Sequence, residues 1–231
     1  RNYASLKFII FTMGGSLGLL LAIQLIGLNA GGFDMLSLFR DFGALDLSVF
    51  GLTSAAVKTI AFWAFVVAFA VKVPVWPFHT WLPDAHTEAP TAGSMILAGV
   101  LLKLGAYGFL RLVLPLFPQE SARFAPVLAA LAAAAIIFGA LAAAGQKDLK
   151  KLVAYSSVNH MGFVMLGVAA VAAAAGGDAA AVQSSRIAAS GAALQMVNHG
   201  LSSAGMFFLV GVLYDRAHTR KLDDFGGLYA I

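Results

Sequence analysis

Long apolar runs separated by short polar connectors make up most of this sequence. A helix that crosses a lipid bilayer needs about 20 consecutive, mostly apolar residues. Six stretches satisfy that condition: Lys7–Leu28, Ala56–Val73, Thr91–Leu114, Phe124–Gly145, Leu149–Ala174 and Ile187–Tyr214. The pattern predicts an all-α fold, a polytopic membrane helix bundle with about six transmembrane helices in a single transmembrane domain over residues 1–231.

Two connectors between these runs stand out. Residues Asn29–Ala55 are glycine-rich at their start and carry four charged side chains, which predicts a loop with a short interfacial helix. Residues Pro74–Pro90 contain four prolines. Proline lacks a backbone N–H and clashes with the preceding helical turn, so a proline-broken helix is expected to stop or kink at Lys72. Whether Ala169–Asp178 extends the fifth helix or forms a loop stays open.

Two lysines lie within apolar runs. Lys72 follows a stretch with no other charge back to Lys58, and Lys103 lies near the middle of the third run. A charged side chain at the bilayer centre costs roughly 2.5–3.5 kcal/mol on insertion scales, so an intramembrane lysine indicates a function. The alternatives are that Lys72 snorkels to the headgroups and that Lys103 forms a structural pair with an acid on another helix.

A lysine in such surroundings is suited to loading and releasing a proton. Desolvation favours the neutral amine, and an approaching carboxylate favours the charged ammonium. The six predicted spans contain no Asp or Glu. The acid that pairs with Lys72 is therefore expected outside this sequence.

The fifth and sixth runs each carry a polar ridge that includes a histidine. The ridges consist of Ser156, Asn159 and His160 in the fifth run and of Gln195, His199, Ser202 and Ser203 in the sixth. Side chains at these spacings share one face of a helix. They could hold helices together by hydrogen bonds, or form a hydrated proton relay, because histidine titrates near neutral pH.

Metal and thiol chemistry has little support in the sequence. His79 and His86 lie seven residues apart near Asp84 and Glu88, but these spacings match no zinc signature. With no cysteine, disulfides, thiolate metal sites and Cys-ligated iron–sulfur clusters are excluded. We expect no cofactor and no metal in this chain.

The composition fits a chain whose main partner is the lipid bilayer. Of the 231 residues, 60% are hydrophobic and 11% charged, whereas soluble domains carry about 25% charged residues. The net charge of +4 does not indicate nucleic-acid binding, because most cations flank the apolar runs, where they meet headgroups. Lys147, Lys150 and Lys151 are expected to make such headgroup contacts.

The cations also predict an orientation. One side of the predicted bundle collects eight of them and the other side five. The larger group comprises Arg1, Lys7, Lys147, Lys150, Lys151, Arg216, Arg220 and Lys221. The positive-inside rule places that side, with both ends of the sequence, in the cytoplasm. The absence of an initiator Met and of a signal peptide leads us to interpret the sequence as an internal fragment of a longer protein.

Three blocks resemble one family of membrane proteins. They are KVPVWPFHTWLPDAHTEAPTAGSMILAGVLLKLG at 72–105, DLKKLVAYSSVNHMGFVMLG at 148–167 and QMVNHGLSSAGMFFLVGVLYDRAHTR at 195–220. These blocks are similar to the antiporter-like membrane subunits of the proton-pumping NADH–quinone oxidoreductase (respiratory complex I). The run AHTEAPTAGS and the ending LYDRAHTR resemble the chain M, or subunit 4, type rather than chains L and N or the sodium/proton antiporter subunits.

This resemblance implies a fourteen-helix fold with two inverted five-helix repeats, of which the sequence would form helices six to eleven. Lys72 would be the lysine of the broken seventh helix and Lys103 that of the eighth. His199 would belong to a polar axis along the middle of the membrane. A glutamate that pairs with Lys72 would precede Arg1, and an ionisable residue on helix twelve would follow Ile231.

The predicted function is proton translocation through Lys72, Lys103, His199 and His160, driven by electron transfer to quinone elsewhere in the complex. The chain would be enzymatic only as a subunit, with flavin, iron–sulfur clusters and quinone in other subunits, chains L and N as neighbours, no nucleic acid, and the bacterial inner membrane as its location. The alternatives are a subunit of a cation/proton antiporter or membrane-bound hydrogenase, or a structural subunit whose lysines only hold helices together.

Overall fold

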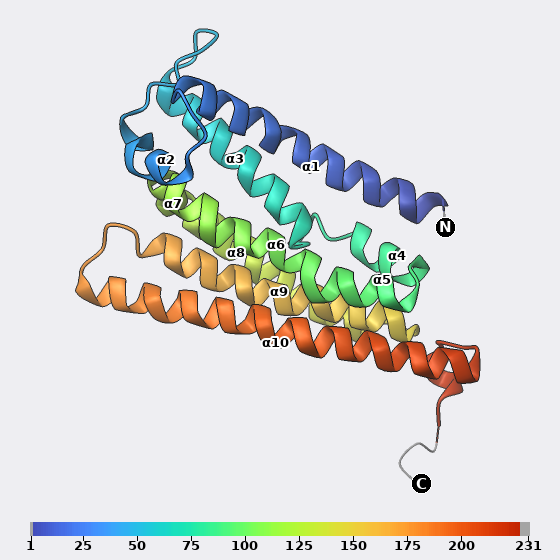
Figure 1. Cartoon of the computed structure of the whole chain (residues 1–231). Helices are drawn as coiled ribbons and strands as arrows, with labels where there is room; N and C mark the ends of the chain where they lie inside the picture. Colours follow the sequence, from blue (N-terminus) through green and yellow to red (C-terminus); the bar gives the residue numbers. More distant parts are fainter. Residues whose placement is uncertain (1, 227–231) are drawn as a thin grey trace.

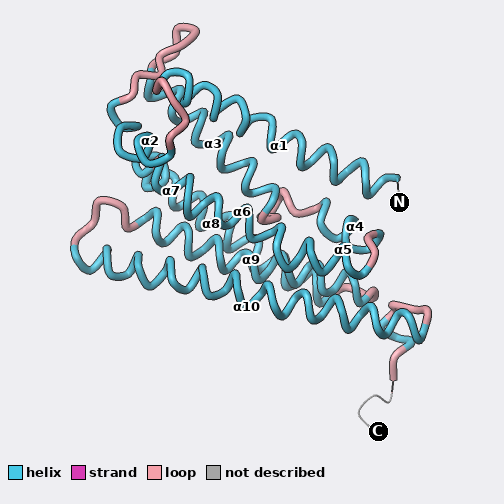
Figure 2. Tube along the Cα trace, viewed as in Figure 1, coloured by secondary structure: helices cyan, strands magenta, loops and turns pink. Residues whose placement is uncertain are grey.

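Six long helices run side by side, and shorter helices lie at their ends (Figure 1). The computed structural model describes residues 2–226, and the helices and loops of that range are traced in Figure 2. The long helices are α1 (Asn2–Asn29), α3 (Ser54–Lys72), the composite span Thr91–Leu116, α8 (Pro118–Ala144), α9 (Leu149–Ala173) and α10 (Ala179–Ala217). All six are long and apolar enough to cross a membrane, so the chain is an integral membrane protein.

The composite span is an α-helix that is interrupted twice by a π-helical segment. It consists of α5 (Thr91–Ile96), the π-helix η2 (Leu97–Leu101), α6 (Leu102–Gly108), the π-helix η3 (Phe109–Val113) and α7 (Leu114–Leu116). The remaining short elements are α2 (Met35–Asp41), the 3₁₀-helix η1 (Phe42–Ala44), α4 (Trp81–Glu88) and the 3₁₀-helix η4 (Leu222–Asp224). The short helix predicted within Asn29–Ala55 is therefore confirmed as α2, and its interfacial position stays a prediction.

The six predicted spans are confirmed, and their ends differ most at α10. This helix begins at Ala179 rather than at Ile187, because the Asp178 side chain caps it by accepting a hydrogen bond from Ala181 N at 2.9 Å. The open question about Ala169–Asp178 is settled, since α9 ends at Ala173 and a turn follows.

The longer helices also take in two acids. Glu120 lies in the first turn of α8, and Asp215 lies near the end of α10. The prediction that the spans contain no acid is therefore wrong at the helix ends, although it holds for their apolar middles. Acidic side chains are tolerated better at the ends of a membrane-spanning helix than in its middle, because there they can reach headgroups or water.

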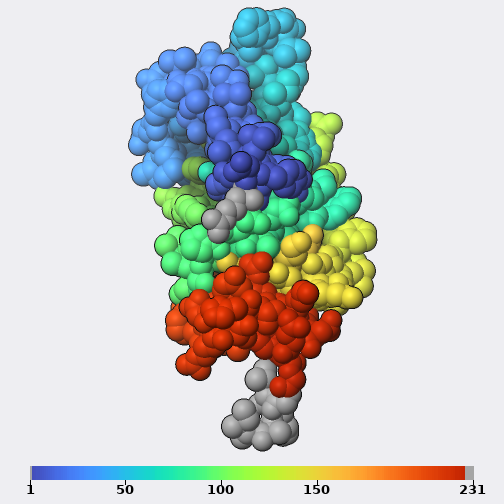
Figure 3. Space-filling model, turned by 90° about the vertical axis from the view of Figure 1, so that its right-hand side faces the viewer, coloured from blue at the N-terminus to red at the C-terminus, as the bar shows by residue number. Residues whose placement is uncertain are grey.

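The helices are stacked roughly in sequence order. In Figure 1, α1 forms one edge of the bundle and α10 the opposite edge, with α3, the composite span, α8 and α9 between them. The end view in Figure 3 shows the same order as a change of colour from blue to red. Both edge helices leave large apolar side chains uncovered, for example Leu17 (60% exposed) on α1 and Leu201 (75% exposed) on α10. An exterior of this kind suits lipid or further membrane helices.

A cluster of phenylalanines fixes the end of the bundle at which α2 and α7 lie. The Phe117 ring centroid lies 5.0 Å from that of Phe42, 5.3 Å from that of Phe65 and 5.9 Å from that of Phe62, all in edge-to-face geometry. Aromatic pairs of this kind contribute about 0.5–1.5 kcal/mol each beyond their area burial. They join the segment after α2, the helix α3 and the start of α8.

The predicted grouping of the cations agrees with the helix directions. The starts of α1, α5 and α9 and the ends of α3, α8 and α10 point to the same side of the bundle. Arg1, which was counted in the larger group, lies outside the described residues. Which side faces the cytoplasm stays a prediction.

Candidate functional site

Lys72 is the last residue of α3, as the prolines predict. Beyond it the hydrogen-bond pattern widens, and Val75 N donates to Ala70 O at 2.9 Å. The chain then turns back into α4, whose Trp81 donates from Nε1 to Val71 O at 2.9 Å. This bond satisfies a carbonyl that the interrupted helix leaves free, as burial at membrane depth requires. The sequence predicted the break but not the short helix α4 that follows it.

The Lys72 side chain lines a cavity of about 300 Å³ between α1, α3, α4 and the composite span. Its walls are mostly apolar and include Trp81 and Leu101, with hydroxyls from Thr12 and Ser16 of α1. Among residues 2–226, no side chain forms a hydrogen bond or an ion pair with Lys72. Lys72 therefore stands at the end of a broken helix, as predicted, beside a cavity lined mostly by apolar side chains.

Lys103 is held much more firmly. Its Nζ donates a hydrogen bond to Ala98 O within η2, and it lies 2.6 Å from Nδ1 of His199 on α10. A π-helix has a wider turn than an α-helix and is common at functional sites. Because an ammonium can only donate, His199 Nδ1 must accept from a charged Lys103, which leaves the imidazole proton on Nε2.

His199 connects Lys103 to a second histidine. Its side chain is nearly buried (3% exposed), and its Nε2 has no hydrogen-bond partner among the described residues. The His160 ring of α9 lies 5.8 Å from it, centroid to centroid. Gln195 Nε2 lies 3.2 Å from His160 Nδ1. The structure thus brings three predicted site residues, Lys103, His199 and His160, into one row across three helices.

Lys72 lies on the other side of the composite span. A Cβ built on Gly105 would lie 2.9 Å from Lys72 Cβ, whereas Gly200 of α10 packs against Gly99 O and Lys103 Cε. The composite span is thus tightly packed against α3 on one face and against α10 on the other, and its Leu102 side chain is fully buried. The structure does not bring the two lysines into contact, and transfer between them would need water to enter.

Comparison with known proteins identifies the family of this helix arrangement. The family model described as NADH:quinone oxidoreductase/Mrp antiporter, TM, matches residues 1–231. The chain belongs to this family. The resemblance inferred from the three sequence blocks is therefore confirmed at the level of the family.

Individual relatives agree with that assignment. The NADH-quinone oxidoreductase subunit M of Rickettsia prowazekii is 44% identical over 228 residues, which is 99% of this chain and 42% of the relative. The protein of the same name from Pseudomonas aeruginosa is 45% identical over 237 residues, which is 100% of this chain and 42% of the relative. The chain thus spans less than half the length of these relatives.

Two solved structures share the fold. A chain of the respiratory complex I from Thermus thermophilus with bound NADH has a TM-score of 0.78 and 31% identity, and the match covers 100% of this chain and 45% of that chain. A chain of the Mrp complex from Dietzia sp. has a TM-score of 0.72, covering 98% of this chain and 38% of that chain. Its 21% identity shows the fold alone.

The polar side chains predicted to form ridges on α9 and α10 do not all face the row of histidines. Asn159 does not line the row with His160, because its Nδ2 donates to Ile136 O of α8 at 2.7 Å. Ser203 Oγ is buried and donates to the backbone oxygen of His199. Of the predicted polar groups, Gln195 and the two histidines therefore form the row, while Asn159 joins α9 to α8.

Lys150 corrects another prediction, because it does not reach lipid headgroups. Its side chain is buried (6% exposed), and its Nζ donates to Ala89 O in the linker between α4 and α5. The helical register could have revealed this, since Lys150 shares a face with the buried Val153, Ala154 and Ser157. Lys147 is exposed and Lys151 partly so, which is compatible with the predicted headgroup contacts.

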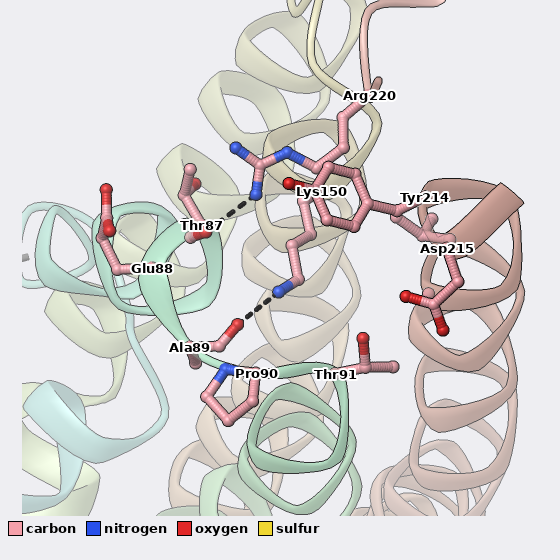
Figure 4. Close-up of a pocket in the computed structure, with 11 residues that line it drawn as sticks. Thr87, Glu88, Ala89, Pro90, Thr91, Lys150, Tyr214, Asp215 and Arg220 are labelled. Atoms are coloured by element: carbon pink, nitrogen blue, oxygen red, sulfur yellow. Dashed lines mark hydrogen bonds between the residues drawn. The ribbon is translucent and has the colours of Figure 1, made fainter. Parts of the chain in front are cut away.

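Lys150 borders a polar cavity of about 650 Å³, which Figure 4 shows in close-up. The cavity lies between the α4–α5 linker, the start of α9 and the end of α10. Its charged lining residues are Glu88, Lys150, Asp215 and Arg220. Sequence reasoning did not connect these residues, which come from three separate segments.

His79 and His86 lie in surroundings that differ from each other. Within residues 2–226 there is no group of three or more His, Cys, Asp or Glu side chains placed to hold a metal ion. His86 is fully buried and stacks on Phe207 of α10, with ring centroids 4.3 Å apart. Asp84 instead forms an ion pair with Lys7 of α1, with Nζ and Oδ2 2.7 Å apart.

Proposed function

We propose that this chain is the central part of a proton-translocating membrane subunit of NADH–quinone oxidoreductase, of the M type. Membership of the NADH:quinone oxidoreductase/Mrp antiporter family and 44–45% identity to subunit M proteins support this assignment. The observation that carries the proposal is the contact between Lys103 and His199, an amine and an imidazole 2.6 Å apart within the apolar bundle.

This pair has the chemistry of a proton relay. When Lys103 is charged it donates to His199 Nδ1, and the imidazole presents its Nε2–H on the opposite edge of the ring. Proton uptake at Nδ1 and release from Nε2 would move one proton across the ring without moving the side chain. His160, 5.8 Å away by ring centroid, would receive that proton through a bridging water.

Lys72 would load the relay from the other face of the composite span. Its partner acid is expected in a part of the longer protein that this sequence does not include. When that acid withdraws, the proton would leave through water that enters the cavity beside Trp81. Lys103 would then receive it on the opposite face of the span.

The free energy for this movement would come from other subunits. Flavin, iron–sulfur clusters and quinone are expected there, because this chain has no cysteine and no predicted cofactor site. We propose that it assembles into a multisubunit membrane complex, with antiporter-like chains L and N as neighbours, in the bacterial inner membrane. The side that carries Lys147, Lys151 and Arg216 would face the cytoplasm.

The test replaces Lys72 by Ala and Lys103 by Met in the full-length subunit, within the assembled complex. We expect normal assembly, lower coupled quinone reduction and a lower proton-to-electron ratio in both variants. Lys147→Met, at an exposed lysine of the predicted cytoplasmic side, is the matched control and should leave the ratio unchanged.

Two outcomes would contradict the proposal. A normal proton-to-electron ratio in both variants would show that neither lysine carries protons. Loss of assembly in both variants would assign them a purely structural role. Proton movement that requires sodium and proceeds without electron transfer would favour a cation/proton antiporter, the class of the Mrp complex whose fold this chain shares.

A further inference from the structure

The last turn of α4 and the linker that joins it to α5 are held by two cations from distant parts of the chain. Lys150 Nζ donates to Ala89 O, and Arg220 Nη1 donates to Thr87 O at 2.9 Å. Figure 4 shows both side chains reaching the linker from one side, with Asp215 across the cavity on α10. Lys150 lies in the first turn of α9, whereas Arg220 lies in the segment that follows α10.

These contacts satisfy backbone groups that a helix end leaves free. The last four carbonyls of a helix lack intrahelical partners and carry partial negative charge, which favours cations there. At the end of α4, His86 O accepts from Ser94 Oγ at 3.2 Å, while Thr87 O and Ala89 O accept from the two cations. Hydrogen bonds from charged donors are about twice as strong as neutral ones.

The two segments that carry Lys150 and Arg220 are also joined directly to each other. Asp148 caps α9 by accepting from Lys150 N at 2.8 Å, and its Oδ2 lies 3.3 Å from Arg220 Nε. Backbone bonds from Leu149 N to Arg220 O and from Leu222 N to Lys147 O, each 2.9 Å, join the same two segments. A displacement of the segment after α10 must therefore act on the start of α9 and on the α4–α5 linker together.

The opposite end of α4 forms part of the Lys72 cavity. Trp81, the first residue of α4, lines that cavity and is bonded through Nε1 to Val71 O, one residue before Lys72. The helix has eight residues and is thus about 12 Å long. Because a short helix moves as a unit, a shift at Thr87–Ala89 reaches Trp81 and changes the wall beside Lys72.

We infer that Lys150 and Arg220 are positioning residues of the proton path, which hold α4 and so set the cavity around Lys72 according to the position of the segment after α10. This inference rests on the proposed function. Neither side chain lies beside Lys72 itself. They act through the carbonyls of Thr87 and Ala89 and through the rigid helix α4.

The test compares Lys150→Met, Lys150→Arg and Arg220→Gln in the assembled complex. Lys151→Met is the matched control, because Lys151 shares the Asp148 cap but has no side-chain hydrogen bond among the described residues. In Lys150→Met and Arg220→Gln we expect normal assembly and a proton-to-electron ratio that falls to the value of Lys103→Met. Lys150→Arg, which keeps a charged donor, should restore the ratio.

The outcomes separate this inference from the proposed function. A lower ratio in Lys103→Met with a normal ratio in Lys150→Met and Arg220→Gln would overturn the inference alone. Normal ratios in all three variants and in Lys72→Ala would overturn the proposed function as well. Failure of both Lys150→Met and Arg220→Gln to assemble, or a ratio that stays low in Lys150→Arg, would reduce the two cations to a structural role and contradict the inference.

Discussion

Lys72 and Lys103 occupy opposite kinds of environment. Lys72 stands at the end of α3 beside a mostly apolar cavity of about 300 Å³, without a hydrogen-bond partner among residues 2–226. Lys103 lies in the middle of the composite span and is held by Ala98 O and by His199. Under the proposed function, Lys72 would be the group that changes its partner, whereas Lys103 would exchange a proton with a fixed neighbour.

The two environments arise from two ways of interrupting a helix. Before α4, proline ends the helix outright, and the carbonyl of Val71 is satisfied by the Trp81 side chain instead of by the backbone. In η2 the helix continues but widens, and the Ala98 carbonyl becomes available to Lys103. A full break creates a junction with space beside it, whereas a π-helix creates a local site within a continuous span.

The contact with His199 distinguishes Lys103 from Lys72, so replacing His199 has the largest expected effect. His199→Leu leaves the Lys103 ammonium with only the Ala98 carbonyl, and loss of a hydrogen bond to a charged group costs about 1.5–3 kcal/mol. We expect that decrease in the free energy of unfolding, measured by denaturant titration of the detergent-solubilised full-length subunit. His160→Leu is the control, because His160 is exposed and loses only one long hydrogen bond. Equal losses in both variants would show that the Lys103–His199 contact is not special.

Close packing of α10 on η2 is the next requirement of the Lys103 site. In Gly200→Ala the new Cβ would lie 3.1 Å from Gly99 O and 3.6 Å from Lys103 Cε, so the two helices must separate slightly. Overpacking of this kind costs about 1–3 kcal/mol, and it should lengthen the Lys103–His199 contact and slow coupled quinone reduction. The measurement is turnover together with thermal stability of the complex.

The matched control lies on the same helix. A Cβ on Gly205 meets no atom within 4 Å among the described residues, and alanine favours helix over glycine by about 1 kcal/mol. Gly205→Ala should therefore leave turnover unchanged and stability unchanged or higher. If Gly200→Ala behaves in the same way, the close approach of the two helices does not control the Lys103 site.

The sequence predicts the spans well, because a bilayer imposes one length and one polarity on every helix that crosses it. It also predicts the break after Lys72, since Pro74 removes a hydrogen bond whatever the surroundings are. The early start of α10 was missed because the stretch 183–186 is polar, although Asp178 provides an N-cap signal. Both π-helices were missed, because they arise from tertiary contacts and leave no periodic pattern in the sequence.

The site was predicted by residue type but not by arrangement. Lys103, His199 and His160 were each singled out from polarity within apolar runs, yet their order across three helices depends on helix rotation, which the sequence does not specify. The same applies to Asn159, which faces Ile136 rather than the row of histidines. Lys150 was taken for a headgroup contact because its charge was weighed without its register on α9.

The smallest expected change in stability is at Lys72. Lys72→Met keeps the length of the side chain, removes a charge from a mostly apolar cavity and leaves no described group without its partner. Substitutions that touch no specific partner usually stay within about ±0.5 kcal/mol. We expect a change in the free energy of unfolding within that range in the same denaturant titration. In the assembled complex, by contrast, we expect Lys72→Met to lose coupled proton transfer.

A larger effect at Lys72 would change the comparison itself. If Lys72→Met lowered the free energy of unfolding by about 1–3 kcal/mol, it would have left a buried acid of the longer protein unpaired. Lys72 would then have a fixed partner at rest, as Lys103 has, and proton release would require that acid to withdraw, as the proposed function states. A change near zero, together with lost pumping, would instead show that Lys72 carries protons without a strong resting partner, beside the cavity that Trp81 lines.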